Sequence, residues 1–154
     1  MSEDVWSYAL KLYSRPGVEA ACLALQEGGA DVCLLLAATW LGTRGVAFHD
    51  ERLAALEGVA EPWRRTVIEP LRALRQQWRE QAQQDSELRT MRERLQQLEL
   101  DAERSLLDRL SGVARGWPEE GAQDEQRWLH AAAGKAGGNR HGALEHLRTA
   151  ASLL

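Results

Sequence analysis

Apolar residues recur three or four positions apart along most of the chain, and this spacing places them on one side of a helix. The pattern predicts an all-α fold of seven or eight helices in a single domain, residues 1–154. The expected helices occupy residues 3–13, with Ser2 as N-cap, then 16–27, 31–41, 50–57, 62–82 and 87–111, followed by a C-terminal helix pair within 122–154.

The segment from Asp31 to Leu41 differs from the others because it is apolar on every face. It is about three turns long if helical, well below the roughly 20 residues that a membrane span needs. A helix that is apolar all round has to be buried. We therefore expect this segment to be the buried axis of a core unit formed by residues 3–58.

Glycine and proline divide the region that follows. Asp50 is a suitable N-cap for a short helix that Gly58 would end, and Pro62 can start the next one. Pro70 lies inside the apolar stripe of that next helix. Because proline removes a backbone hydrogen bond and clashes with the preceding turn, we expect a kink or a fresh start near Thr66–Glu69.

A long helical hairpin is predicted at residues 62–111. The stretch from Leu71 to Ser111 contains neither Gly nor Pro. One continuous helix of that length would reach roughly 60 Å, beyond the diameter of such a domain. The break is expected at residues 83–86, where Asp85 or Ser86 could cap the second arm.

Composition agrees with a helical, globular chain. Of the 154 residues, 44% are hydrophobic and 27% are charged, and Ile68 is the only isoleucine. Cys22 and Cys33 form no C-x-x-C pair, so we expect two buried free thiols in a reducing compartment. The N-terminus shows no pattern of a secretory signal, and we expect a cytoplasmic protein without a membrane span.

Several residues of the N-terminal part form a pattern that is similar to a known family. They are Trp6, Tyr13, Pro16-Gly17-Val18, Cys22-Leu23, Leu25-Gln26, Asp31-Val32, Leu34-Leu35 and Trp40. On these residues the chain resembles the DUF2390 proteins of gammaproteobacteria, most clearly over residues 5–42. The resemblance implies a helical fold in a bacterial cytosol and no particular activity. Cys33 departs from the pattern, since the family usually has Asn there.

No arrangement of reactive side chains predicts a catalytic, cofactor or metal site. His141 and Glu145 are followed by His146, but this spacing is one residue too long for the zinc motif H-x-x-E-H. Gly134-Lys135 lacks the other residues of a phosphate-binding loop. His49-Asp50 is explained by capping, since consecutive side chains point apart.

The surface with most functional promise carries Arg65, Arg72, Arg75 and Arg79, which fall at i, i+7, i+10 and i+14. On an uninterrupted helix they form one stripe beside Trp78. We call these five residues the Arg/Trp ridge. Such a ridge suits an acidic partner protein or a phosphate backbone. Alternatively, these arginines are a solvated face paired with glutamates of neighbouring helices, and a kink would separate Arg65 from the rest.

The first hypothesis is therefore a non-catalytic interaction or regulatory module that presents the ridge to a protein partner. Nucleic-acid binding through the same face is the alternative, although the net charge of −4 argues against it. A small-ligand or enzyme role would need a polar-lined pocket, near His49 or near the C-terminal histidines. The apolar arm at 88–110 could serve a homodimer or simply pack within the hairpin.

Overall fold

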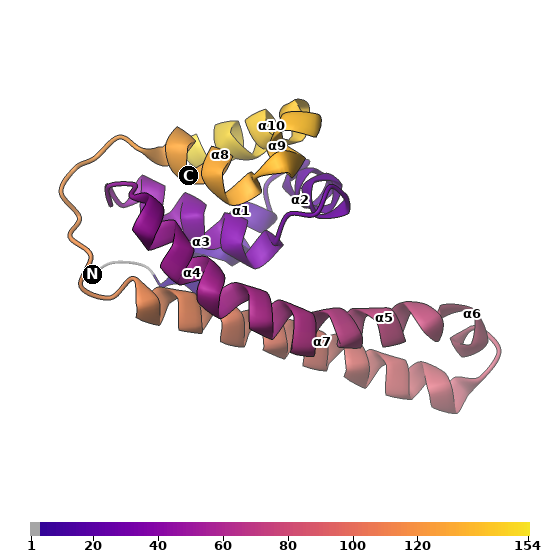
Figure 1. Ribbon diagram of the computed structural model, residues 1–154. Coiled ribbons are helices and arrows are strands. Elements are labelled where there is room, and N and C mark those ends of the chain that lie inside the picture. The colour runs from indigo at the N-terminus through magenta and orange to yellow at the C-terminus, as the bar shows by residue number, and fades with distance from the viewer. Residues whose placement is uncertain (1–3) are drawn as a thin grey trace.

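The computed structural model describes residues 4–154, which form helices joined by short loops (Figure 1). Among these residues the only β-type contact is an isolated bridge between Val46 and Glu119. The all-α, single-domain prediction is confirmed, and the predicted count was approximate because short turns such as α6 and α9 stand as helices of their own. The elements are α1 (Val5–Tyr13), α2 (Val18–Glu27), α3 (Val32–Thr43), α4 (Asp50–Trp63), the π-helical η1 (Arg64–Ile68), α5 (Glu69–Gln77), α6 (Arg79–Ala82), α7 (Ser86–Val113), α8 (Glu125–Ala133), α9 (Lys135–Asn139) and α10 (His141–Ser152).

Helix α3 is the buried axis that its sequence predicts. Every residue from Cys33 to Gly42 is buried, and the helix packs against α1, α7 and α8. Asp31 caps it, because its Oδ1 accepts a hydrogen bond from the backbone N–H of Leu34 at 3.2 Å. Gly42 permits the close approach of α8, since a Cβ there would lie only 2.7 Å from the Cα of Glu125. Helices α1–α3 and α8–α10 together form a unit that we call the body.

The C-terminal helices complete the core of the body. Trp128 of α8 is fully buried and donates its indole N–H to the carbonyl of Val46 at 2.9 Å. Helix α10 packs on α2, and the Nε2 atom of His146 lies 2.8 Å from the carbonyl oxygen of Pro16. At the other end of the chain α1 is capped by Asp4, whereas the expected cap Ser2 lies outside the described residues.

The first arm of the long hairpin begins earlier than predicted, at Asp50 rather than at residue 62. The expected helix end at Gly58 was wrong, because α4 runs through both Gly58 and Pro62. The expected cap by Asp50 was also wrong, because His49 occupies the N-cap position. A proline in a helix removes only one backbone hydrogen bond, and the packing of α4 on α7 compensates for it.

The predicted irregularity before Pro70 is a π-helical turn at Arg64–Ile68. There the N–H of Glu69 donates to the carbonyl of Arg64, five residues earlier. Pro70 has no N–H to offer the carbonyl of Thr66, so the regular ladder cannot continue and the chain takes one wider turn. The π-helical turn overlaps the predicted location, Thr66–Glu69, and begins two residues before it.

Helix α7 forms the second arm and is 28 residues long. The break predicted at residues 83–86 is confirmed, and Asp85 caps α7 by accepting hydrogen bonds from the N–H groups of Glu87 and Leu88. Helices α4 and α5 pack along α7 in turn. We call the unit α4–η1–α5–α6–α7 the hairpin, and its α5–α6 end projects well beyond the body (Figure 1).

Candidate ligand cavity between the body and the hairpin

A cavity of about 320 Å³ lies where the hairpin leaves the body. Its lining comes from α1, α2 and α3 on one side and from η1, α5 and α7 on the other. The apolar part of its wall includes Trp6, Val32, Leu36, Ile68 and Leu107. The volume falls at the lower end of the range that small-molecule sites occupy in proteins.

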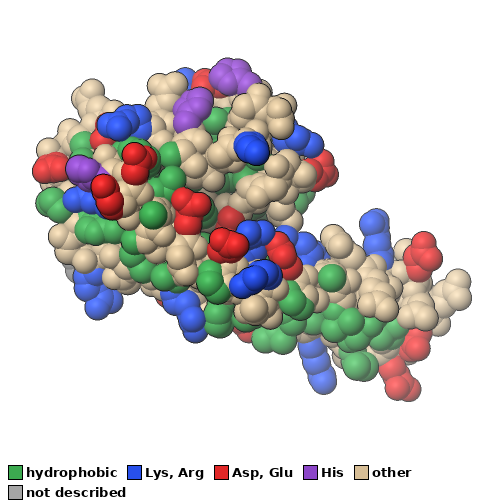
Figure 2. Space-filling view, viewed as in Figure 1, with side chains coloured by type: hydrophobic (Ala, Val, Ile, Leu, Met, Phe, Trp, Pro, Cys, Tyr) green, Lys and Arg blue, Asp and Glu red, His purple; other side chains and the backbone are tan. Residues whose placement is uncertain are grey.

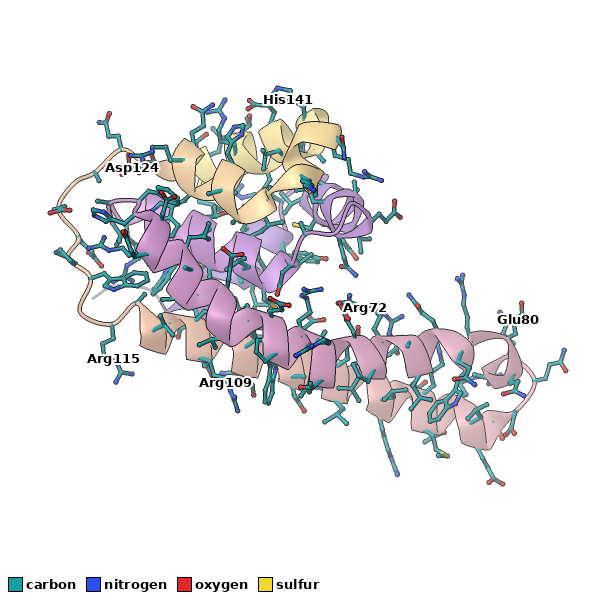
Figure 3. The ribbon with its side chains drawn as sticks, viewed as in Figure 1. Arg72, Glu80, Arg109, Arg115, Asp124 and His141 are labelled. Carbon is teal, nitrogen blue, oxygen red and sulfur yellow. The ribbon has the colours of Figure 1, made fainter. Side chains whose placement is uncertain are left out.

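The hairpin contributes an ionic cluster to the wall of this cavity. The Glu99 carboxylate of α7 accepts from the Nε atoms of Arg75 at 2.6 Å and of Arg72 at 3.3 Å. The Nη2 atom of Arg75 gives a third contact at 3.3 Å. Glu99 is buried, and Figure 3 shows Arg72 on the edge of the hairpin that faces the body. One carboxylate thus holds two guanidinium groups, which retain further N–H donors.

A second charged pair joins the body to the hairpin. The Nε atom of Arg64 lies 3.5 Å from the Oδ2 atom of Asp31, and both atoms are buried with no hydrogen-bond partner among residues 4–154. The Nη1 atom of Arg64 instead donates to Glu69 at 2.6 Å. Asp31 uses its other oxygen to cap α3. The Nε and Oδ2 atoms therefore face each other as an ion pair without a hydrogen bond between them.

Burial raises the pKa values of two carboxyl groups in the cavity wall. The pKa of Asp31 is raised, chiefly by burial, which outweighs its hydrogen bond from Leu34 and the charge of Arg64. The pKa of Glu103, which also lines the cavity, is raised by burial and then by repulsion from Glu99. Arginine keeps its charge at any ordinary pH. The three carboxyl groups of the wall, Asp31, Glu99 and Glu103, are matched in number by the three guanidinium groups of Arg64, Arg72 and Arg75.

The mouth of the cavity is apolar and open to solvent. Leu10, Leu23 and Leu100 line the cavity, and each is a large apolar side chain that remains about half exposed. They come from three different helices, α1, α2 and α7. Exposed apolar residues that gather around a concave site are typical of a surface that another molecule covers.

Two members of the predicted Arg/Trp ridge belong to this cavity, and the others do not. Arg72 and Arg75 turn towards Glu99 and line the cavity. Arg65 and Arg79 are exposed and form no ion pair within the described residues, and Trp78 is half-buried where α5 ends. The π-helical turn adds a residue to one turn and so rotates the positions before it by about 100° relative to those after it. The ridge is therefore not one continuous stripe.

Sequence reasoning missed four residues of the cluster, Asp31, Arg64, Glu99 and Glu103. A signal for Glu99 was present, because it lies four residues after Leu95 and three before Ala102, on the face of α7 that packs inwards. A lone carboxylate on an apolar face opposite two arginines predicts a buried ion pair. Asp31 was recognised only as the first residue of a buried helix, with no sign that Arg64 would lie beside it.

The other candidates from the sequence lie outside the cavity. His146 contacts the Pro16 carbonyl, and Glu145 pairs with Arg148 at 2.9 Å. Within residues 4–154 no three His, Cys, Asp or Glu side chains are grouped as a metal ion would require. No described helix has both the length and the apolar character needed to cross a bilayer.

The profile of DUF2390, described as a protein of unknown function, matches residues 4–110. No curated protein and no solved structure matches the chain. All residues that line the cavity lie within the matched range, whereas α8, α9 and α10 lie after it.

Proposed function

The chain belongs to the DUF2390 family, and we propose that it is a non-catalytic protein that binds a small amphipathic organic anion in the cavity between the body and the hairpin. The observation that carries the proposal is the arrangement of that cavity. Three arginines, Arg64, Arg72 and Arg75, line it, while half-exposed leucines surround its mouth. The anionic group would bind the guanidinium groups and the apolar part would cover the leucines.

The ionic cluster supports an anion as the ligand's polar group. Arg72 gives one hydrogen bond to Glu99, and its Nη2 atom is 3.9 Å from Glu103, a distance too long for a hydrogen bond. Its remaining N–H groups are available for a carboxylate, sulfonate or phosphate, which arginine binds through paired hydrogen bonds. A bound anion would raise the pKa values of Asp31 and Glu103 further, because it adds negative charge beside them.

A binding role fits the cavity better than catalysis does. Cys33 is the thiol in the cavity wall, and burial raises its pKa well above the ordinary value. A thiol that remains protonated is a poor nucleophile. Its Sγ atom lies 3.8 Å from the backbone carbonyl of Glu103, which is not a base. Tyr13, whose pKa burial raises to about 12, is equally unsuited to proton transfer near neutral pH.

The Arg/Trp ridge no longer favours a protein or nucleic-acid partner, since Arg72 and Arg75 are engaged by Glu99. We also propose that the protein works in the bacterial cytoplasm. The state of the two cysteines supports this setting, because Cys22 and Cys33 are both free and buried, as expected in a reducing compartment.

The test uses anilinonaphthalene sulfonate, an amphipathic anion that fluoresces in apolar sites. The wild-type protein should bind it saturably at one site. Arg72→Gln should weaken binding about tenfold, because a charge-assisted hydrogen bond contributes about 1.5–3 kcal/mol. Leu23→Glu should weaken it as well, since it adds a negative charge at the mouth. Leu23 is exposed, so this change leaves the core intact.

Two matched controls lie outside the cavity. Arg79→Gln removes an arginine from the exposed α6, and Leu98→Ser removes an exposed leucine from α7, neither of which lines the cavity. Both should leave the affinity unchanged. Equal affinity of all variants for the probe, or a weaker probe complex in the controls alone, would refute the proposed site. Circular dichroism of each variant verifies that its helices are intact.

A further inference from the structure

One face of α7 is exposed along the projecting part of the hairpin and is apolar at its centre. Met91 and Leu98 are 51% and 52% exposed, and they lie seven residues apart, on the same side of the helix. Arg94 and Asp101 flank Leu98 at i−4 and i+3, and both are exposed. We call Met91, Arg94, Leu98 and Asp101 the outer face.

The outer face points away from the cavity. Leu107, which lines the cavity, lies nine residues after Leu98 and so about 180° around the helix. In Figure 3, Arg109 of α7 lies on the hairpin edge opposite to that of Arg72. Figure 2 shows hydrophobic side chains along the same lower edge of the hairpin. Nothing else in the described chain covers this edge, and the projection of the hairpin leaves it accessible (Figure 1).

We propose that the outer face binds a second copy of this chain, with two α7 helices packed antiparallel about a two-fold axis at Leu98. Charge complementarity identifies the occupant. Arg94 is about 6 Å before Leu98 along the axis and Asp101 about 4.5 Å after it. Antiparallel packing therefore brings Arg94 of each copy opposite Asp101 of the other. Along the helix axis the two positions differ by only about 1.5 Å. Two equal ion pairs then flank a central contact between leucines.

A two-fold contact requires a surface that complements itself, and the outer face meets this condition. The apolar centre supplies the association free energy, and the reciprocal ion pairs select the antiparallel register. Because the buried area is confined to one helix face of each copy, the dimer is weak and concentration-dependent. The cavity lies on the opposite side of α7, so this inference stands independently of the ligand proposed above.

Sedimentation velocity over a concentration series at low ionic strength tests the dimer. The wild-type mass should rise with concentration from 17.2 kDa towards about twice that value. Arg94→Glu and Asp101→Arg should each weaken dimerisation at least about tenfold, because each places like charges together twice. The double variant with both changes should restore the dimer, since the pairs are then exchanged.

The matched control is Glu93→Arg, which reverses an exposed charge on α7 about 140° away from Leu98. It should dimerise like the wild type. A wild type that remains monomeric at every concentration would overturn the proposal and leave the face to a different protein. A dimer that the two single reversals do not weaken, or that the double reversal fails to restore, would overturn the antiparallel α7 contact.

Discussion

Replacement of Glu99 by alanine should destabilise the protein by about 3 kcal/mol, because it leaves two guanidinium groups without their shared carboxylate. Removing one partner from a buried ion pair typically destabilises a protein by about 3–5 kcal/mol. The lower end applies here. The side chain of Glu99 is only 8% exposed, but those of Arg72 and Arg75 are 23% and 24% exposed, so water can partly hydrate them.

Thermal and urea unfolding of the variant measure this effect. For a chain of this length, about 3 kcal/mol corresponds to a fall in Tm of about 6–12 °C. Hydrogen exchange should increase first in α5 and in the facing part of α7, since Glu99 joins these two helices. A loss in the free energy of unfolding below about 0.5 kcal/mol would refute the reasoning, because an exposed ion pair has that magnitude.

A triple variant separates the ion cluster from the packing around it. Replacement of Glu99, Arg72 and Arg75 together by leucine or methionine leaves no unpaired charge. Its stability should lie within about 1 kcal/mol of the wild type, since well-packed apolar residues often replace a buried ion pair without loss. A triple variant as unstable as Glu99→Ala would show that the cavity wall cannot accept apolar side chains.

The remaining predictions concern the backbone and the caps. Asp31→Asn keeps the cap of α3, whereas Asp31→Ala should lower stability by about 1 kcal/mol at neutral pH. Burial raises the pKa of Asp31 above its ordinary 3.8. The contribution of Asp31 to the free energy of unfolding therefore decreases as the pH rises from 3.8 through the folded-state pKa. Urea unfolding at a series of pH values should show this decrease in the wild type and not in Asp31→Asn. Gly17→Ala should destabilise by about 1–2 kcal/mol, because Gly17 has φ +79°. Its new Cβ would also lie 2.4 Å from His146 Nε2, and adding His146→Ala should relieve only that clash in thermal unfolding. Pro70→Ala should raise the free energy of unfolding by about 1 kcal/mol, because alanine supplies an N–H for the carbonyl of Thr66. Unfolding in urea measures this change, and an unchanged free energy would contradict the explanation given for the π-helical turn.

Elements set by local chemistry were predicted from the sequence. The uniformly apolar composition of residues 31–41 required burial, and α3 is buried along its length. The lack of Gly and Pro between Leu71 and Ser111 required a turn within the stretch, and Asp85 marked its position. Pro70 marked the π-helical turn. In each case a single physical constraint, such as burial, length or a missing N–H, was sufficient.

Features that depend on tertiary packing could not be predicted in this way. The local sequence predicts a helix end at Gly58 and a helix start at Pro62. Helix α4 nevertheless continues through both residues, because it packs against α7. Pairing of the ridge arginines with glutamates of neighbouring helices was one of the two alternatives, and it is confirmed for Arg72 and Arg75. Glu99 itself could not be named as the partner, because it lies 27 and 24 residues away along the chain. No spacing rule connects residues across a hairpin before its turn is known.

The composition of the cavity wall is the strongest reason to seek its role in binding. Well-packed apolar residues often replace a buried ion cluster without loss of stability, so a contribution to folding is a weak explanation for the cluster around Glu99. The separate pair of Asp31 and Arg64 is also buried, with its Oδ2 and Nε atoms 3.5 Å apart and no hydrogen bond between them. An amphipathic anion would accept hydrogen bonds from the guanidinium groups of Arg72 and Arg75, whose side chains are partly exposed. The two guanidinium groups that Glu99 holds in the cavity wall would therefore bind such a ligand.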